Sequence, residues 1–294
     1  MERFYIITNQ QKDEGLVTTR RIQKYLLEHG RQCQVREFQT ERREKPVQTQ
    51  EYPARYTDID LVPEDTQCIL VLGGDGTLIQ AARDTLFRQI PLLGINMGTL
   101  GYLAEIEKSN LEHALDCLME DRYTIEERMM LAGRVYREGK LIARDCALND
   151  IVISRYGSLR VISCQLYVNG AFLNAYSADG IIVATPTGST GYSLSAGGPI
   201  VSPSAAMTIL TPICPHTLNT RSIVLSAQDQ IQIRVGPGKC ASREEALVTF
   251  DGEHAAVLGE GDYVEIEAAK QVTKIIKISN ASFLDVLRSK MREN

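Results

Sequence analysis

The sequence lacks the features that mark membrane, secreted, disulfide-bonded and nucleic-acid-binding proteins. It has no run of about 18 apolar residues, and MERFYIITNQ has no signal-peptide core, so we expect neither membrane spanning nor export. The seven cysteines are far apart without a CxxC pair, which favours reduced thiols over disulfides or zinc ligands. Lys and Arg are scattered and the net charge is −5, so no basic surface for nucleic acid is predicted. A cytoplasmic protein is expected, in which any acidic substrate is bound by a local site.

Three common site motifs are also missing. No GxxxxGK[ST] phosphate loop occurs, and the first strand is followed by NQQKDEG in place of the dinucleotide fingerprint GxGxxG. No GxSxG elbow supports a hydrolase. The usual nucleotide-binding and hydrolase signatures therefore do not describe this chain.

Residues 1–125 alternate between apolar strands and amphipathic helices, which predicts an α/β domain with a parallel sheet. The polar segment 39–67 predicts an exposed loop. The strands are expected at RFYIIT, CQVREF, CILVLGG and PLLGIN, and the helices at residues 17–27, LIQAARDTLF and LEHALDCLME.

Residues 126–272 change to period-two alternation with turns at REGK, VNG and ADG. This pattern predicts a mainly β domain of antiparallel strands, like a β-sandwich. The tail ASFLDVLRSKM is helical in spacing, and residues 273–294 are expected to return to the first domain.

The stretch VLGGDGTLIQAAR, residues 71–83, places an acid between glycines where a strand leads into a helix. The glycines and the free N–H groups of the helix predict a phosphate site. Asp75 has two interpretations: it caps the helix, or it holds a hydroxyl in line with a phosphorus atom and accepts its proton. The second interpretation accounts for more of the residues, because a cap requires no flanking glycines.

Residues 177–198, SADGIIVATPTGSTGYSLSAGG, crowd small hydroxyl residues and glycines after an apolar strand. This density of donors and bare backbone favours a loop that binds a polar ligand over an ordinary tight loop. Asn149 and Asp150 precede the strand IVIS, and on their own they indicate no more than a turn.

GGDGT, GINMGTLGYLAEI, LND, DGIIVATPTGSTGYSLSAGGP, TPICPHTLNTR and FDGE follow one another in this order. Together they resemble a bacterial NAD kinase over nearly the whole chain. GGDGT also occurs in lipid kinases and in relatives of phosphofructokinase, so the TPTGSTGYSLSAGGP block is the more specific part of the resemblance.

The resemblance implies transfer of the terminal phosphate of ATP to the 2′-hydroxyl of the adenosine ribose of NAD, with Mg²⁺ on the phosphates. The active site would lie between the domains. The β domain, residues 126–272, would bind NAD and would join the chains of a homodimer or homotetramer. Asp75 would be catalytic and would contact NAD with Gly76, and the phosphate loop would be Gly73, Gly74, Gly76 and Thr77. The other residues implied to bind NAD are Asn149, Asp150, Arg160, Asp179, Thr190, Gly191, Tyr192, Ser193, Leu194 and Ser195.

The sequence departs from the family pattern at four positions. Gly191 stands where alanine is common, Gln80 and Ser177 stand where basic side chains are frequent, and Glu253 replaces a frequent glutamine. Roles near the product phosphate are therefore not assigned to Gln80, Ser177 or Glu253. Two alternatives remain, a lipid kinase that shares GGDGT and a dinucleotide sensor without turnover.

Overall fold

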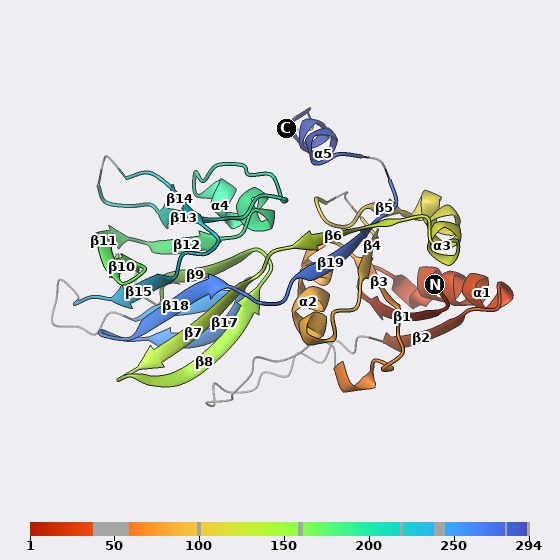
Figure 1. The fold of residues 1–294 in the computed structure, drawn as a ribbon, viewed down its shortest axis with the longest axis horizontal. Coiled ribbons are helices and arrows are strands. Elements are labelled where there is room, and N and C mark those ends of the chain that lie inside the picture. Colours follow the sequence, from red (N-terminus) through yellow and green to blue (C-terminus); the bar gives the residue numbers. More distant parts are fainter. Residues whose placement is uncertain are drawn as a thin grey trace. The chain divides into compact units, whose positions relative to one another are not determined.

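The computed structural model describes residues 1–37, 59–98, 101–157, 161–217, 220–237, 245–279 and 281–292, except the side chains of Arg36, Glu37 and His254. Two compact units divide the chain (Figure 1). The N-terminal unit holds the described residues up to Arg128 and those from Gln271 onward, and the C-terminal unit holds those from Met129 to Lys270. Residues 39–58, most of the predicted polar loop 39–67, lie outside the described residues.

The sheet of the N-terminal unit is mostly parallel, as predicted, in the order β2-β1-β3-β4-β19-β6 with β5 beside β4. Only β6 pairs antiparallel, with β19. The strands are β1 (Arg3–Thr8), β2 (Gln32–Glu37), β3 (Cys68–Gly73), β4 (Leu92–Asn96), β5 (Ile106–Glu107), β6 (Thr124–Arg128) and β19 (Thr273–Lys277).

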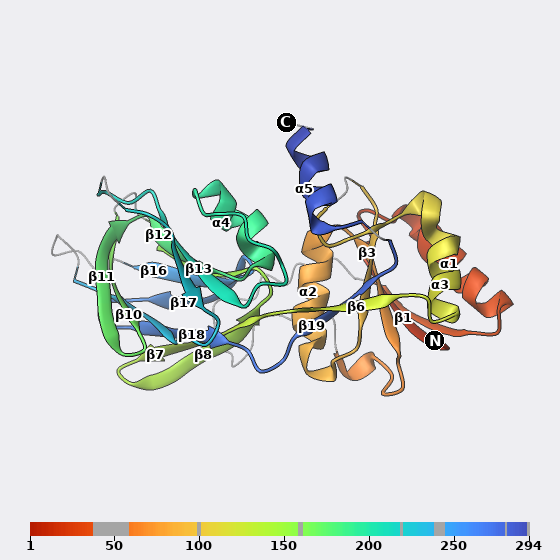
Figure 2. The same cartoon turned by 45° about the horizontal axis from the view of Figure 1, so that its top comes forward.

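Three helices cover this sheet. Apolar side chains of α1 (Val17–Glu28) and α3 (Leu111–Met119) share one core with alternate residues of β1, β3 and β4. The other long helix, α2 (Asp75–Thr85), lies on the opposite side of the sheet (Figure 2). Short 3₁₀ turns occur at η1 (Glu14–Leu16), η2 (Ile59–Leu61), η3 (Leu86–Arg88) and η4 (Lys108–Asn110).

The C-terminal unit consists of two antiparallel sheets, which confirms the predicted β class. Their inner faces share one hydrophobic core, so the unit is a sandwich. One sheet contains β11 (Ala171–Ala178), β10 (Ile162–Val168), β15 (Ile231–Val235), β18 (Tyr263–Ala268), β7 (Leu131–Arg137) and β8 (Lys140–Ala147). The other contains β14 (Ile223–Ser226), β13 (Met207–Ile213), β12 (Gly180–Ala184), β9 (Asp150–Arg155), β16 (Ala246–Phe250) and β17 (Glu253–Leu258).

Two features of the fold differ from the pattern-based expectation. The predicted loop after β12 contains a 3₁₀ turn, η5 (Thr187–Thr190), and a short helix, α4 (Tyr192–Ser195). The chain also returns to the first sheet through a strand, β19, before α5 (Phe283–Arg292) begins. No residue of α5 is buried, and the packing of its apolar side chains stays a prediction.

The described cysteines are free thiols, and burial raises the pKa of both Cys33 and Cys164 to about 12. Thiols of this kind are poor nucleophiles. Within the described ranges, no helix has the length and apolar character needed to cross a membrane.

Candidate active site

The GGDGT stretch connects β3 to α2. Gly74 is the N-cap of α2 in an extended conformation, with φ −122° and ψ −170°, and Asp75 is the first helical residue. No side chain caps the helix, so the helix-cap interpretation of Asp75 is wrong. The carboxylate of Asp75 is engaged elsewhere.

The carboxylate of Asp75 is held by three successive backbone N–H groups of the segment after β4. Tyr102 donates to Oδ2 at 2.7 Å, and Leu103 and Ala104 donate to Oδ1 at 3.2 and 3.0 Å. A carboxylate offers about four lone-pair positions, so the half-buried group keeps room for a further donor on Oδ2. Asp75 is therefore fixed in place and still able to accept a hydrogen bond.

Gly101 allows this clamp to close. A Cβ at position 101 would lie 2.0 Å from Asp75 Oδ1 and 2.3 Å from Oδ2, far inside van der Waals contact. Gly101 does not have a positive φ, so the requirement for glycine is one of space alone. Gly101 lies in the motif GINMGTLGYLAEI, but nothing in the sequence indicates its contact with Asp75.

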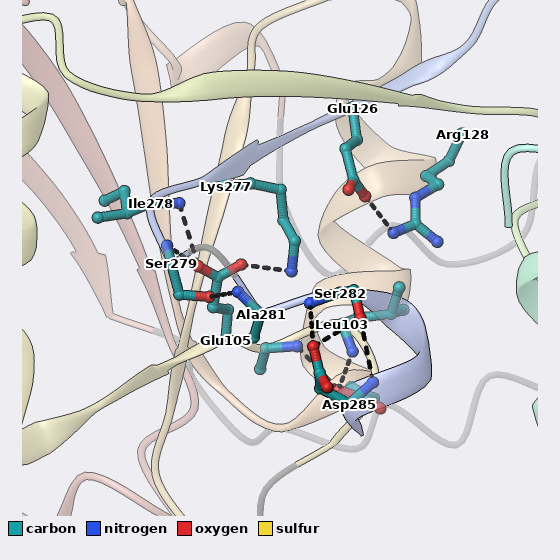
Figure 3. A network of polar contacts seen from close by, with 12 residues as sticks. Leu103, Glu105, Glu126, Arg128, Lys277, Ile278, Ser279, Ala281, Ser282 and Asp285 are labelled. Carbon is teal, nitrogen blue, oxygen red and sulfur yellow. Dashed lines mark hydrogen bonds and ion pairs between the residues drawn. The ribbon is translucent and has the colours of Figure 1, made fainter. Parts of the chain in front are cut away.

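Glu105 anchors the other end of the clamping segment. It is paired with Lys277 and accepts a hydrogen bond from Ile278 N at 3.0 Å, with Ser279 N also donating to it (Figure 3). Burial by itself would raise the pKa of Glu105, but the Lys277 and Ser279 hydrogen bonds lower it below the ordinary value. Residues 102–105 are thus tied to α2 by one carboxylate and to the end of β19 by another.

The glycines around Asp75 have different surroundings. The side chain of Thr77 fills the space beside Gly73, where a Cβ would lie 2.3 Å from Thr77 Oγ1. A Cβ on Gly74 would lie 2.8 Å from Lys12 Nζ, whereas Gly76 has no described neighbour within 4 Å of such a Cβ. Gly76 therefore leaves its backbone open to an incoming group.

A second carboxylate clamp lies in the C-terminal unit. Asp251, in the turn between β16 and β17, accepts hydrogen bonds from the backbone N–H groups of Leu148 at 2.7 Å, Asn149 at 2.7 Å and Asp150 at 3.1 Å. Asp251 itself has a positive φ of 49°, and Gly252 follows at 82°. The FDGE motif indicates a turn, but nothing in the sequence indicates that Asp251 contacts the backbone of residues 148–150.

Asn149 and Asp150, which the clamp positions, have unusual polar environments. Asn149 Oδ1 is buried and finds no hydrogen-bond partner among the described residues, which indicates a place for an external donor. Asp150 is 6% exposed. Burial, and secondarily the charge of Asp251, raises the pKa of Asp150 from 3.8 to about 7.

An Asp150→Asn variant is expected to gain stability over the wild type as pH rises. Because the folded chain keeps a proton that the unfolded chain has lost, wild-type stability falls between about pH 4 and pH 7. The variant has no such titrating group. Its free energy of unfolding, relative to that of the wild type, should therefore rise between about pH 4 and pH 7 and level off above pH 7. Urea unfolding of both proteins at pH 5, 6, 7 and 8 tests this, and a constant difference would contradict it.

The segment after β12 packs against Asn149. Thr185 donates its N–H to Asn149 O at 2.8 Å and its hydroxyl to Leu148 O at 2.6 Å. A Cβ on Gly188 would lie 2.1 Å from Asn149 O, whereas one on Gly191 would lie 3.6 Å from Asn149 Nδ2. The structure thus places Asn149 beside both Gly188 and Gly191.

Several of the predicted hydroxyls serve the fold. The buried Ser193 hydroxyl bonds Thr211 Oγ1 at 3.1 Å, and the buried Ser189 hydroxyl bonds the backbone of Val201. The residues that remain accessible are Thr190, which is half-buried, and Tyr192, Leu194 and Ser195, which are exposed.

The remaining candidates are placed as follows. Asp179, just before β12, pairs with Arg155 at 3.3 Å. Gln80 is bonded to Asp84 within α2 at 3.0 Å. Arg160 lies outside the described residues. Asp75 and its glycines belong to the N-terminal unit, and the predicted NAD-binding residues from Asn149 onward belong to the C-terminal unit.

Comparison with known proteins identifies the family. Residues 4–123 match the model of the ATP-NAD kinase N-terminal domain, and residues 148–278 match that of the C-terminal domain. An NAD kinase of Lachnospira eligens is 46% identical, covering 99% of this chain and 100% of the relative. One of Lachnoclostridium phytofermentans is 42% identical, covering 99% of each chain.

Two solved structures share the fold. Yeast NADH kinase in complex with NADH has a TM-score of 0.81 at 22% identity, covering 100% of this chain and 88% of that one, which shows the fold alone. An NAD kinase from Archaeoglobus fulgidus in complex with ATP has a TM-score of 0.75 at 25% identity, covering 99% of each chain. Neither alternative, lipid kinase or sensor, finds support among these matches. The chain belongs to the NAD kinase family, a family of phosphotransferases.

Proposed function

We propose that this chain transfers the terminal phosphate of ATP to the 2′-hydroxyl of the adenosine ribose of NAD, giving NADP and ADP. The observation that carries the proposal is the carboxylate of Asp75, which three backbone amides fix beside an open glycine and which keeps an acceptor position on Oδ2. A carboxylate in this state can hold a hydroxyl without itself moving.

In this reaction the 2′-oxygen forms a bond to the terminal phosphorus while the bond from that phosphorus to the bridging oxygen breaks. ADP leaves with the electron pair of that bond, and the hydroxyl proton passes to Asp75 and then to solvent. Phosphoryl transfer has a loose transition state, so positioning contributes more than strong basicity. A carboxylate held by the amides of Tyr102, Leu103 and Ala104 suits that positioning role.

A divalent cation, Mg²⁺ by preference, is expected on the phosphates of the donor. Within the described ranges no three His, Cys, Asp or Glu side chains gather into a metal site. Mg²⁺ in kinase sites is commonly held through substrate phosphates and water. When bound, the ion would neutralise negative charge on the phosphates.

The C-terminal unit supplies the proposed NAD site. The unpaired Asn149 Oδ1 can accept a hydrogen bond from the adenine amino group, and Asp150, with its pKa near 7, can donate one when protonated. Tyr192, which is 48% exposed, offers a ring face for stacking. Asp179 and the backbone at Gly191 are proposed for the nicotinamide end. Contacts from Arg160, Thr190, Ser193, Leu194 and Ser195 remain proposals by resemblance.

A Gly188→Ala variant is expected to bind NAD about tenfold more weakly, because its Cβ has to displace the backbone at Asn149. Gly191→Ala is the matched comparison, since its nearest contacts, Gly188 O at 3.3 Å and Asn149 Nδ2 at 3.6 Å, require only a slight adjustment. Calorimetric titration with NAD measures both variants. Equal affinities would contradict the proposed role of Asn149.

The direct test is incubation of the purified chain with NAD, ATP and Mg²⁺, with NADP detected by an NADP-specific dehydrogenase. Formation of NADP supports the proposal. Binding of NAD without any NADP would favour the sensor, and phosphorylation of diacylglycerol in place of NAD would favour the lipid kinase.

We also propose a cytoplasmic homodimer or homotetramer that assembles through the β unit. Phe172 and Leu173 on the edge strand β11 are 59% and 41% exposed, and an uncovered apolar edge favours pairing with another chain. Light scattering that gives a monomer mass would refute the assembly, and recovery of the protein in a membrane fraction would refute the location.

A further inference from the structure

The connection between β1 and α1 packs against the GGDGT stretch. Asn9 donates its N–H to Leu72 O at 2.9 Å, and its side-chain Nδ2 lies 3.5 Å from Thr77 Oγ1. The N–H groups of Lys12 and Asp13 in turn both donate to Asn9 O, at 2.9 and 3.0 Å. The backbone at Lys12 is therefore positioned by the end of β3.

The buried carboxylate of Asp13 fixes this connection on its other side. It accepts hydrogen bonds from Thr18 N at 2.9 Å and from Thr19 N and Oγ1 at 2.9 and 2.6 Å. Asp13 is 3% exposed. The connection is thus attached both to α1 and to the GGDGT stretch, and it does not behave as a free surface loop.

This arrangement holds an ammonium group over the glycine that precedes Asp75. Lys12 Nζ would lie 2.8 Å from a Cβ on Gly74, so it occupies the space that a side chain there would fill. Lys12 is exposed to solvent and forms no ion pair with any residue that the structure describes. An ammonium at the positive end of α2 is electrostatically unfavourable unless an anion lies between them.

We propose that Lys12 binds the phosphates of the donor, as a cation placed beside the GGDGT stretch by Asn9 and Asp13. The inference rests on the proposed function and adds a residue to its donor site. Lysine is a compact point charge that suits a phosphate oxygen. The ligand is a phosphoanhydride chain, which both ATP and inorganic polyphosphate contain.

The test compares Lys12→Gln and Lys12→Arg with the wild type. Loss of one charged contact is expected to weaken binding of ATP·Mg²⁺, and to lower kcat/KM for ATP, by roughly tenfold in Lys12→Gln. Lys12→Arg should retain most of both, and NAD affinity should be unchanged in either variant. Lys24→Gln is the matched control, because Lys24 only pairs with Glu28 at 3.7 Å on the exposed face of α1.

Inorganic tripolyphosphate tests the contacts to the phosphates alone, because it has the phosphoanhydride chain of ATP without the nucleoside. It is expected to displace ATP from the wild type and to do so roughly tenfold less well from Lys12→Gln. Three results would each overturn the role of Lys12: equal affinity of the wild type and Lys12→Gln for ATP, equal losses of ATP and NAD binding, or weaker ATP binding with unchanged tripolyphosphate binding. Calorimetry measures the affinities for ATP and tripolyphosphate even if the wild type makes no NADP. Absence of NADP would refute the proposed function without deciding whether Lys12 binds phosphates.

Discussion

An Asp75→Asn variant is expected to form NADP on the order of 10³-fold more slowly than the wild type, with little change in NAD affinity. The amide oxygen of asparagine can still accept hydrogen bonds from Leu103 and Ala104, so the clamp largely survives. Its NH₂ group would replace Oδ2, which accepts from Tyr102 and is proposed to accept the ribose proton. Catalysis therefore loses its acceptor while the fold loses about one hydrogen bond, on the order of 1 kcal/mol.

The variant is measured by steady-state NADP formation, calorimetry with NAD and thermal unfolding. Asp65→Asn provides a control for the loss of a carboxylate, because Asp65 forms an exposed pair with Arg3 at 3.2 Å. Unchanged turnover in Asp75→Asn would show that Asp75 takes no part in the reaction. A large fall in both variants would point to a cause other than the chemistry at residue 75.

A Gly101→Ala variant is expected to lower kcat on the order of 10²-fold although it alters no polar group. The new Cβ would lie 2.0 Å from Asp75 Oδ1, so either the carboxylate or the segment 102–104 has to move. Either movement takes the carboxylate of Asp75 out of the position in which the backbone N–H groups of residues 102–104 hold it. The affinity for NAD should change much less than kcat, because the proposed NAD contacts lie mainly in the other unit.

Gly98→Ala is the matched control for Gly101→Ala. A Cβ on Gly98 has no described neighbour within 4 Å, and the N–H and C=O of Gly98 would keep their bonds to Asn96. Measuring kcat for both alanine variants distinguishes a steric effect on Asp75 from a general effect of alanine in this loop. Equal turnover in the two variants would contradict the clamp.

Much of the N-terminal unit could be predicted because its signals are local. Apolar runs predicted β1, β3 and β4, and the glycines at the end of β3 indicated a turn into a helix. The helix was expected from LIQAARDTLF, but α2 already begins at Asp75. The partners of Asp75 could not be predicted in the same way. Residues 102–104 lie nearly thirty positions further along the chain, and backbone N–H groups leave no mark in a sequence.

The contacts of other residues in the two candidate sites could not be predicted from the sequence either. Lys12 is one of many scattered charges in the sequence, and Asp251 is one residue of the FDGE motif; their contacts depend on how distant segments pack. Hydroxyl density after β12 predicted a binding segment, but composition could not separate the buried Ser189 and Ser193 from the exposed Ser195. β19 was missed because a short strand pattern does not reveal which sheet it joins.

A crystal structure of this chain with NAD bound would test the role of Asp75 most directly. The ribose 2′-oxygen is expected about 2.6–3.2 Å from Asp75 Oδ2, with the amides of Tyr102, Leu103 and Ala104 still on the carboxylate. A bound NAD whose ribose lies beyond hydrogen-bond reach of Asp75, or that presents its 3′-oxygen there instead, would contradict the proposed reaction.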